Sequence, residues 1–209
     1  MRFGAPSPTV LEYGCGTGPG ACFLAERGFQ VHGIDLIDTA IELAAEQARK
    51  RGLDIHYEVQ DICELPCEGP IYDMIVDSYC LQCIVTDADR HRVFSAVRSH
   101  LRPEGYYLVS TAMLDREGFS EAQVLDVRTG VIYNRYGDGL INAATGIVYV
   151  ELQGNPDEFE HATRIAGGWH LPNRRHLKPS QLKAELETSG FRVQYQDSEL
   201  GGNVICAHA

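Results

Sequence analysis

The hydrophobic pattern changes its period repeatedly along the first half of the chain. Short, mostly apolar segments alternate with segments in which apolar residues recur every three or four positions. The first kind is typical of buried parallel strands and the second of amphipathic helices. Their alternation indicates βαβ units around a parallel sheet. The expected strands are residues 9–13, 30–35, 54–59, 72–77 and 106–111.

The clearest helical period lies at residues 41–48, where Ile41 and three alanines occupy positions i, i+3, i+4 and i+7. Thr39 and Glu42 have the spacing of a capping box, which predicts the start of this helix. Gly52 suits the position just after its end. Further helices are expected at residues 21–28, 88–101 and 179–189.

The alternation stops after the fifth expected strand. Residues 121–168 show no helical period, and the segments GVIYN, GLINA and GIVYVEL are typical of short antiparallel strands. We therefore expect one domain over residues 1–209 with a β-rich insertion at about 121–176. Two closing strands, 192–196 and 203–209, follow the last helix.

Composition narrows the class of protein. The chain has 209 residues, which suits one domain with a full core, and a formal net charge of −11. Such a surface repels phosphate backbones and anionic lipids, so neither nucleic acid nor a membrane surface is expected as a partner. Nothing after Met1 resembles a secretory signal, and no apolar run approaches the roughly 20 residues of a bilayer span. A cytoplasmic location is the resulting expectation.

Metal-binding motifs are weak in this sequence. The seven cysteines are expected to be reduced thiols, mostly buried. The pairs in CELPC and CLQC have no second CxxC partner, and His161, His170 and His176 match no standard ligand spacing. We therefore expect no metal at these motifs.

Alternate glycines at 14–20 join the first strand to the next helix. A glycine loop at that place lets a ligand lie against the backbone at the helix N-terminus. Two frames fit: Gly16, Gly18 and Ala21 match the dinucleotide pattern G-x-G-x-x-G/A, whereas an E-x-G-x-G-x-G frame begins at Glu12. Asp35 ends the second expected strand, and a carboxylate there can accept hydrogen bonds from both ribose hydroxyls of either ligand.

The second frame resembles the first motif of class I S-adenosylmethionine-dependent methyltransferases. VQDICELP resembles that family's adenine site, in which Asp61 takes the exocyclic amine and the Ile62 N–H meets a ring nitrogen. YDMIVDSYCLQCIV resembles the family's fourth-strand motif, although Gln82 and Cys83 stand where His or Glu followed by His is common. LRPEGYYLVS and LKPSQLKAELETSGF resemble later elements, so the resemblance covers about residues 8–112 and 177–209.

This resemblance implies a fold, a cofactor and a set of contacts. The fold would be α/β and Rossmann-like, with a seven-stranded, mostly parallel sheet in the order 3-2-1-4-5-7-6 and helices on both faces. The cofactor would be S-adenosyl-L-methionine. The implied cofactor-binding residues are Glu12, Gly14, Cys15, Gly16, Thr17, Gly18, Asp35, Leu36, Asp61, Ile62, Asp77 and Ser78.

The insertion is the expected substrate cover, because specificity in open α/β folds comes from loops at the carboxyl ends of the strands. Its segment HATRIAGGWHLPNRRH concentrates cations and imidazoles in an acidic chain. One hypothesis is an anionic substrate held by Arg174 or Arg175, with His170 as base; the alternative is a solvated basic loop. The candidate substrate residues are Tyr79, Gln82, Trp169, His170 and Arg174.

The leading functional prediction is methyl transfer to a small-molecule acceptor. One alternative is an NAD(P)-dependent oxidoreductase, which lacks an evident Tyr-x-x-x-Lys pair and leaves Asp61 unexplained. The other is a homologue that binds S-adenosylmethionine without transferring a methyl group. The insertion could also form a homodimer contact rather than a lid.

Overall fold

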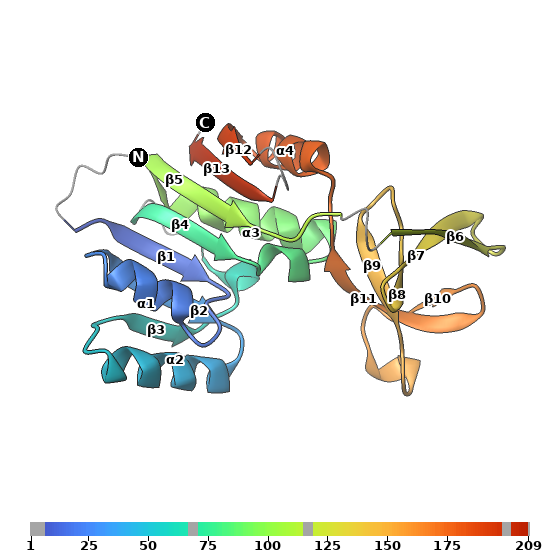
Figure 1. Cartoon of the computed structure of the whole chain (residues 1–209), viewed down its shortest axis with the longest axis horizontal. Coiled ribbons are helices and arrows are strands. Elements are labelled where there is room, and N and C mark those ends of the chain that lie inside the picture. Colours follow the sequence, from blue (N-terminus) through green and yellow to red (C-terminus); the bar gives the residue numbers. More distant parts are fainter. Residues whose placement is uncertain (1–6, 67–70, 115–118, 198–201, 209) are drawn as a thin grey trace.

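The structure is a computed structural model that describes residues 7–66, 71–114, 119–197 and 202–208. In this part of the chain two lobes lie side by side, each built on one β-sheet (Figure 1). We call them the core lobe, which holds the predicted parallel strands, and the inserted lobe, which spans residues 119–175. The inserted lobe follows the fifth strand of the core lobe and precedes its last helix.

Within the described residues, the core lobe holds a seven-stranded sheet in the order β12-β13-β5-β4-β1-β2-β3. Strands β1 to β5 are parallel to one another, and β13 is antiparallel to both β5 and β12. This is the predicted order 3-2-1-4-5-7-6 counted from the other edge, so the α/β Rossmann-like fold is confirmed. The strands are β1 Thr9–Tyr13, β2 Gln30–Asp35, β3 His56–Val59, β4 Tyr72–Ser78, β5 Leu101–Ser110, β12 Phe191–Gln196 and β13 Asn203–His208.

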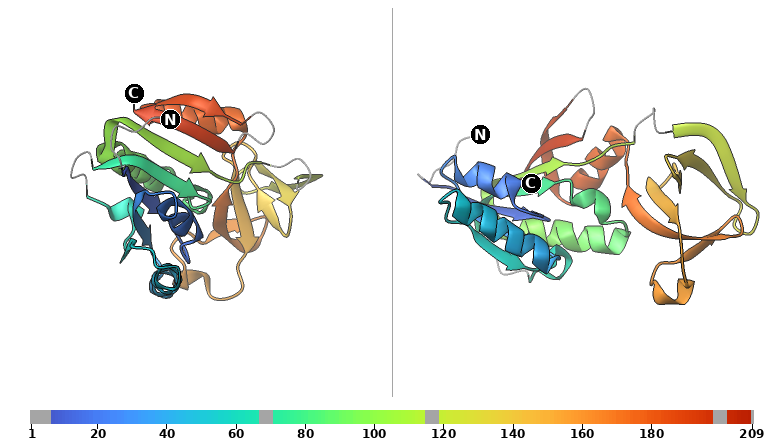
Figure 2. Two further views of the ribbon diagram at one scale, coloured as in Figure 1. Left: turned by 60° about the vertical axis from the view of Figure 1, so that its left-hand side comes forward. Right: turned by 60° about the horizontal axis from the view of Figure 1, so that its bottom comes forward.

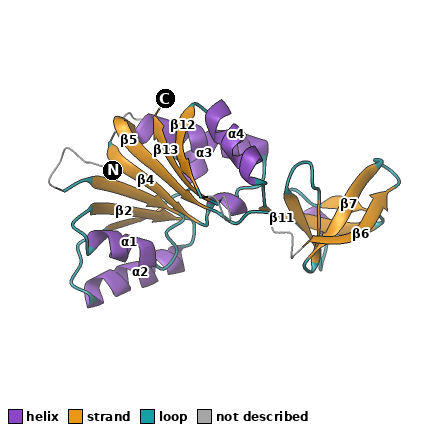
Figure 3. Cartoon of the chain, turned by 45° about the horizontal axis from the view of Figure 1, so that its top comes forward, coloured by secondary structure: helices purple, strands orange, loops and turns teal. Residues whose placement is uncertain are grey.

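Helices cover both faces of this sheet (Figure 3). Leu11 of β1 lies in one hydrophobic core with Val97 of α3 and Leu186 of α4. The next residue, Glu12, lies against Gly20 of α1. Because successive side chains of a strand point to opposite faces, α1 lies on the other side of the sheet from α3 and α4. The helices are α1 Pro19–Ala25, α2 Asp38–Lys50, α3 Asp87–His100 and α4 Pro179–Thr188, with 3₁₀ turns η1 Ile62–Glu64, η2 Leu81–Cys83 and η3 Pro156–Glu158.

Helix α2 begins earlier than the capping-box prediction placed it. Its N-cap is Ile37, so Thr39 already lies inside the first turn and the predicted capping box is wrong. The Ile37 N–H donates to Asp35 Oδ1 at 3.0 Å, which fixes the chain just before the helix. At the other end, Gly52 follows the C-cap with a φ of +67°, as expected for the left-handed residue that ends a helix.

Strand β5 begins at Leu101, whereas the sequence analysis expected the fifth strand to begin at residue 106. Leu101 already pairs with Tyr72 of β4, and the register then shifts before Tyr106 pairs with Met74. The Arg-Pro-Glu-Gly segment is therefore an irregularity inside the strand, because Leu101 continues from α3 directly into the buried sheet.

The described part of the inserted lobe is a six-stranded antiparallel sheet in the order β10-β11-β9-β8-β7-β6, which agrees with the predicted β-rich insertion. It has a small core of its own around Tyr133, Leu140 and Ile165. The strands are β6 Phe119–Asp126, β7 Val131–Tyr136, β8 Gly139–Ile141, β9 Ile147–Glu151, β10 Thr163–Ile165 and β11 Gly168–Arg175.

The basic segment that the sequence suggested as a loop is a β-hairpin. Strands β10 and β11 pair through Arg164 and Trp169, and β11 then pairs with β9. Ala166 and Gly167 form the turn, with φ values of +48° and +93°. Gly167 is thus a turn residue of a paired hairpin. The hairpin escaped prediction because its strands carry little alternation and owe their place to pairing with β9.

A paired neck connects the two lobes. The chain leaves the core lobe through Met113 and Leu114 and returns through Leu177. Met113 and Leu177 form a parallel bridge, and the Leu114 N–H donates to the Leu177 carbonyl at 2.9 Å. The outgoing and returning segments therefore support each other where the inserted lobe is attached.

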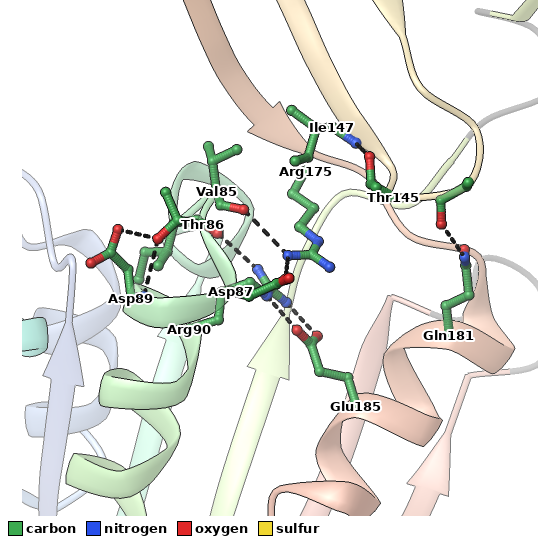
Figure 4. Close-up of polar contacts among 12 residues, drawn as sticks. Val85, Thr86, Asp87, Asp89, Arg90, Thr145, Ile147, Arg175, Gln181 and Glu185 are labelled. Carbon is green, nitrogen blue, oxygen red and sulfur yellow. Dashed lines mark hydrogen bonds and ion pairs between the residues drawn. The ribbon is translucent and has the colours of Figure 1, made fainter. Parts of the chain in front are cut away.

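Side-chain contacts reinforce this neck (Figure 4). Arg175 Nη1 donates to the Val85 carbonyl at 3.3 Å and to Asp87 Oδ1 at 2.5 Å, just before and at the start of α3. Gln181 of α4 donates to the Ala144 carbonyl at 3.2 Å. A cation beside the acidic first turn of a helix is the reverse of the usual dipole arrangement, so the Asp87 carboxylate is what makes this contact favourable.

Helices α3 and α4, which lie on the same face of the core-lobe sheet, are joined by a buried ion pair. Arg90 of α3, with 3% of its side chain exposed, donates from Nε and Nη2 to both carboxylate oxygens of Glu185 at 2.6 Å. Its Nη1 also donates to the carbonyls of Leu81 and Ile84 at 2.8 and 3.1 Å. The guanidinium therefore ties α3 and α4 to the turn after β4, and each of its three nitrogens donates a hydrogen bond.

None of the helices in the described part of the chain combines the length and apolar character that a bilayer crossing requires.

Glu185→Ala leaves the Arg90 guanidinium buried without its counter-charge. We expect a loss of about 3 kcal/mol in the free energy of unfolding, measured by urea denaturation. Glu187→Ala is the matched control, because its pair with Lys183 is half exposed and 3.9 Å long. It should cost no more than about 0.5 kcal/mol. Equal effects of the two variants would show that the buried pair adds nothing to stability.

Candidate active site

The glycine loop between β1 and α1 has a left-handed backbone at alternate positions. Gly14, Gly16 and Gly18 have φ values of +61°, +54° and +82°, which residues with a side chain rarely adopt. A Cβ on Gly14 would overlap Cys80, and one on Gly18 would overlap Tyr57. A Cβ on Gly16 would meet no described atom within 4 Å. Packing therefore explains two of these glycines, while Gly16 presents bare backbone to open space.

Glu12 lies beneath this loop with its carboxylate buried. Its oxygens fill the place of a Cβ on Gly20, and Ser78 and the Ala21 N–H lower its pKa in opposition to burial. Burial raises the pKa of Glu12 to about 7. Oε2 has no hydrogen-bond partner among the described residues. Glu12 thus supports the loop from the side of α1, and direct contact with a cofactor stays a prediction.

Asp35 joins the glycine loop to the end of β2. Its Oδ2 accepts the Gly16 N–H at 2.8 Å, and its Oδ1 accepts the Ile37 N–H at 3.0 Å. Each carboxylate oxygen can accept more than one hydrogen bond, so both retain capacity for a ligand hydroxyl. Leu36, beside it, is largely exposed. An exposed apolar side chain next to a partly satisfied carboxylate suits a nucleoside lying across this edge.

Asp61 occupies the corresponding place after β3. Its Oδ1 accepts the Cys63 N–H at 2.8 Å and caps the turn η1. The preceding residue, Gln60, donates its backbone N–H to the Asp35 carbonyl at 3.0 Å. Ile62 is buried in the core below. The ends of β2 and β3 are therefore linked, which sets the two acidic residues beside each other.

A cavity of about 410 Å³ lies at these strand ends. Ligands of open α/β sheets bind at such a place, outside the carboxyl ends of the strands. Two of its lining residues, His161 and Pro172, come from the inserted lobe. The remainder come from the core lobe: Gly14, Asp35, Leu36, Gln60, Asp61, Ile62, Cys63, Glu64, Cys80, Cys83, Ile84, Val85, Thr86, Asp89 and Arg92.

The structure brings five of the predicted cofactor residues to this cavity, namely Gly14, Asp35, Leu36, Asp61 and Ile62. Gly16 is linked to them through its hydrogen bond with Asp35. Thr17 and Gly18 line a separate cavity of about 270 Å³ between α1 and α2. The predicted residues outside the main lining are Glu12, Cys15, Gly16, Thr17, Gly18, Asp77 and Ser78, and their cofactor contacts stay predictions.

Asp77 is fully buried at the end of β4. Its Oδ1 accepts the N–H groups of Cys80 and Leu81 at 2.9 and 2.8 Å, and so holds the turn that leads into η2. Burial raises the pKa of Asp77 to about 7. Below it, the hydroxyls of Tyr13 and Tyr107 lie 2.5 Å apart, and burial raises the pKa of both. Asp77 therefore shapes the wall of the cavity from behind.

The predicted substrate residues of the core lobe lie outside the lining. Tyr79 is 58% exposed and has a φ of +67°, an unusual conformation for an aromatic residue, held by its N–H bond to the Ser110 carbonyl at 2.7 Å. Gln82 is buried, and its Oε1 accepts the Ala112 N–H at 2.8 Å. Gln82 thus anchors the chain as it leaves β5, and a substrate contact for either residue stays a prediction.

The predicted substrate residues of the inserted lobe also lie elsewhere. His170 lines another cavity of about 270 Å³ within the inserted lobe, and its Nδ1 lies 3.3 Å from the Gly168 carbonyl. Trp169 is 41% exposed, and Arg174 is exposed. None of the three is among the residues that line the main cavity. The inserted lobe instead reaches that cavity with His161.

Sequence reasoning missed His161, Arg92 and Asp89 as residues of the cavity. Asp89 and Arg92 form an ion pair at the start of α3, and Arg92 also lies 3.4 Å from Glu64. The Thr86 hydroxyl and Arg92 lower the pKa of Asp89. The sequence does contain a signal for Asp89 and Arg92: the polar segment TDADRHR, at the start of α3, directly follows the fourth-strand motif.

Charge in the cavity is predominantly negative. Asp35, Asp61, Glu64 and Asp89 line it together with Arg92, and two of these carboxylates already face the guanidinium. A cavity with more carboxylates than cationic side chains attracts a positively charged ligand and disfavours the pyrophosphate of a dinucleotide. The open backbone at Gly16, the carboxylates at two strand ends and this charge fit an aminoacyl sulfonium nucleoside.

Comparison with known proteins agrees with this geometry. Residues 10–105 match the family described as a methyltransferase domain. The ubiquinone biosynthesis O-methyltransferase of Rickettsia prowazekii is 34% identical over 102 residues, 49% of this chain and 39% of that protein. Phosphoethanolamine N-methyltransferase 2 of Caenorhabditis elegans is 31% identical over 96% of this chain and 44% of that protein. The chain thus spans about two fifths of the length of these curated relatives.

A solved SAM-dependent methyltransferase from Methanosarcina mazei superposes with a TM-score of 0.67 at 19% identity, covering 98% of this chain and 93% of that one. At that identity the likeness establishes a shared fold. The core lobe therefore has the fold of class I S-adenosylmethionine-dependent methyltransferases. Residues 10–105 thus resemble the methyltransferase-domain family, and the comparisons support S-adenosyl-L-methionine as the cofactor. The family resemblance is confirmed, and the dinucleotide frame is not favoured.

Asp35→Ala tests the predicted ribose contact. We expect binding of S-adenosylhomocysteine, measured by isothermal titration, to weaken by about 1.5–3 kcal/mol, the scale of a hydrogen bond to a charged group. Asp38→Ala is the matched control, because Asp38 is exposed at the start of α2 and lies outside the cavity lining. Unchanged affinity in Asp35→Ala, or equal losses in both variants, would contradict the assignment.

Proposed function

We propose that this protein transfers a methyl group from S-adenosyl-L-methionine to a small-molecule acceptor. The observation that carries the proposal is the cavity of about 410 Å³, which is lined by Asp35 and Asp61 of the core lobe and by His161 of the inserted lobe. The match of residues 10–105 to the methyltransferase-domain family supports the reaction class.

Methyl transfer from a sulfonium requires the protein mainly to position the two reactants. When bound, the cofactor supplies a methyl group on a sulfonium, which is already an activated leaving group. In this proposal Asp35 accepts hydrogen bonds from the ribose hydroxyls. Asp61 accepts one from the exocyclic amine of adenine, and the Ile62 N–H donates to a ring nitrogen. The protein must then align the acceptor and exclude water. In this proposal the inserted lobe contributes to that exclusion through His161 and Pro172, which line the cavity.

His161 is the residue that we propose as general base, in place of His170. The names of the two curated relatives state an O-methyltransferase and an N-methyltransferase. Oxygen and nitrogen acceptors both carry a proton that must leave, and an imidazole is the commonest group to receive it near neutral pH. His161 lines the cavity, whereas His170 lines the separate cavity of the inserted lobe.

The charge of the acceptor is a finer part of the proposal. The sequence analysis expected an anion held by Arg174 or Arg175. Arg175 is bonded to Asp87 and Val85 at the neck, and Arg174 is exposed away from the cavity lining. Arg92, the guanidinium of the described lining, already faces Asp89 and Glu64. These contacts favour a neutral or cationic acceptor over an anionic one.

The expected homodimer is likewise a proposal. In the described part of the inserted lobe, β6 forms one edge of the sheet, and Leu125 and Val127 on and beside it are 53% and 86% exposed. Exposed apolar side chains along a sheet edge support a contact with a second copy. The same lobe can serve as lid and as contact, because its cavity-facing residues lie on another part of it.

The test is a methyl-transfer assay with a panel of phenols, primary amines and carboxylates, with products identified by mass spectrometry. For the acceptor that turns over, His161→Ala should lower kcat by about 10²-fold or more and leave S-adenosylhomocysteine affinity within about twofold. His170→Ala is the control and should change neither quantity. Loss of kcat in His170→Ala but not in His161→Ala would contradict the assignment of the base.

Binding of S-adenosylhomocysteine and of NADH, measured beside this assay, separates the alternatives. S-adenosylhomocysteine binding without transfer to any acceptor would favour a catalytically silent homologue. Binding of NADH in preference to S-adenosylhomocysteine would favour the oxidoreductase and overturn the proposal.

A further inference from the structure

A cluster of potential metal ligands lies on the other half of β2 and β3, away from the cavity. His32 of β2 is the register partner of His56 in β3, and Glu58 follows two residues later on the same strand. Because side chains alternate along a strand, His56 and Glu58 point to the same face of the sheet. A ligand atom from each of the three residues lies within 4.8 Å of the others.

The distances suit a transition metal. His32 Nε2 lies 3.5 Å from Glu58 Oε2. Ligand atoms about 2.1 Å from a tetrahedral zinc ion stand about 3.4 Å apart, so this pair already has the required separation. His32 Nε2 is buried and has no hydrogen-bond partner among the described atoms. The rings of His32 and His56 have centroids 4.5 Å apart, and a ring nitrogen of the exposed His56 lies within 4.8 Å of the other two ligand atoms.

The other ring nitrogen of His32, Nδ1, has a hydrogen-bond partner. Nδ1 lies 2.7 Å from the Tyr72 hydroxyl of β4. When Nδ1–H donates to that hydroxyl oxygen, the lone pair of Nε2 is left free for a metal. Metal-bound histidines characteristically have such a partner on the other ring nitrogen, which fixes both tautomer and ring orientation.

The cluster is open to solvent and separate from the proposed methyl-transfer site. Tyr57, between His56 and Glu58, points toward α1 and α2, where it meets the positions of Gly18 and Ala44. His56 and Glu58 therefore lie on the opposite face, where they are exposed. His32 stands three residues before Asp35, about 10 Å along the strand, and none of the three ligands lines the main cavity.

We propose that His32, His56 and Glu58 bind one divalent transition-metal ion of the zinc class. Two imidazoles and a carboxylate select such ions over magnesium or calcium, which prefer oxygen ligands. Three protein ligands leave a fourth position for water. The ion links the edge strand β3 to β2, and β3 leads directly to Asp61. The site thus secures the strand that carries one of the predicted nucleoside contacts.

The experiment titrates Zn²⁺, and in parallel Co²⁺, into the metal-free full chain. One equivalent should bind, with the visible absorption of a tetrahedral cobalt site and no thiolate charge-transfer band. His56→Ala and Glu58→Gln should each weaken this binding at least about tenfold, and Tyr72→Phe should weaken it roughly tenfold through His32. His91→Ala is the control, because His91 is an exposed histidine on α3, outside the cluster.

Circular dichroism checks that each variant is folded, and His56 and Glu58 are exposed enough for their replacement to leave the fold intact. Three outcomes overturn the proposal. They are the absence of a saturable site in the unaltered chain, wild-type affinity in His56→Ala and Glu58→Gln, and a thiolate band that assigns the bound ion to the cysteines.

Discussion

The hydrogen bond from the Gly16 N–H to Asp35 is the contact on which the proposed site depends. It draws the glycine loop, at the end of β1, against the end of β2. The loop can follow this path only because Gly14, Gly16 and Gly18 adopt left-handed backbone conformations. The same carboxylate also fixes the start of α2 through Ile37. One acidic side chain thereby orders the loop, the helix and the edge of the cavity together.

Two buried carboxylates stand behind this edge. Glu12 supports the loop from the side of α1, and Asp77 holds the turn after β4. Burial raises the pKa of both to about 7, so each is kept in place at a cost to the charged form. Neither lines the main cavity. They act on the site by shaping the backbone that faces it, as buried polar groups near functional sites often do.

Local patterns predicted the core lobe well. Strands 9–13 and 30–35 were placed to the residue, because a buried parallel strand leaves an apolar run bounded by turn residues. Asp35 was found because it ends the second of these strands, and Asp61 was found through the resemblance of VQDICELP to the family's adenine site. Local reasoning failed where pairing partners decide: the β10–β11 hairpin has little pattern of its own, and Asp35, rather than Thr39, determines where α2 begins.

The residues of the inserted lobe were harder still, since their distance from the core lobe depends on the path of the neck. Sequence alone identified a stretch rich in histidine and arginine, but not that His161 reaches the cavity while His170 faces another one and Arg175 is used at the junction. A side chain's role there follows from tertiary placement, which neither periodicity nor spacing encodes.

The central claim is that a sulfonium nucleoside lies across the ends of β1, β2 and β3. A crystal structure of the complex with S-adenosylhomocysteine tests it most directly. The account predicts the ribose hydroxyls on Asp35, the purine beside Asp61 and Ile62, and the sulfur facing the side of the cavity that His161 approaches. The account would be contradicted if the nucleoside occupied the cavity between α1 and α2, or if it lay within the inserted lobe.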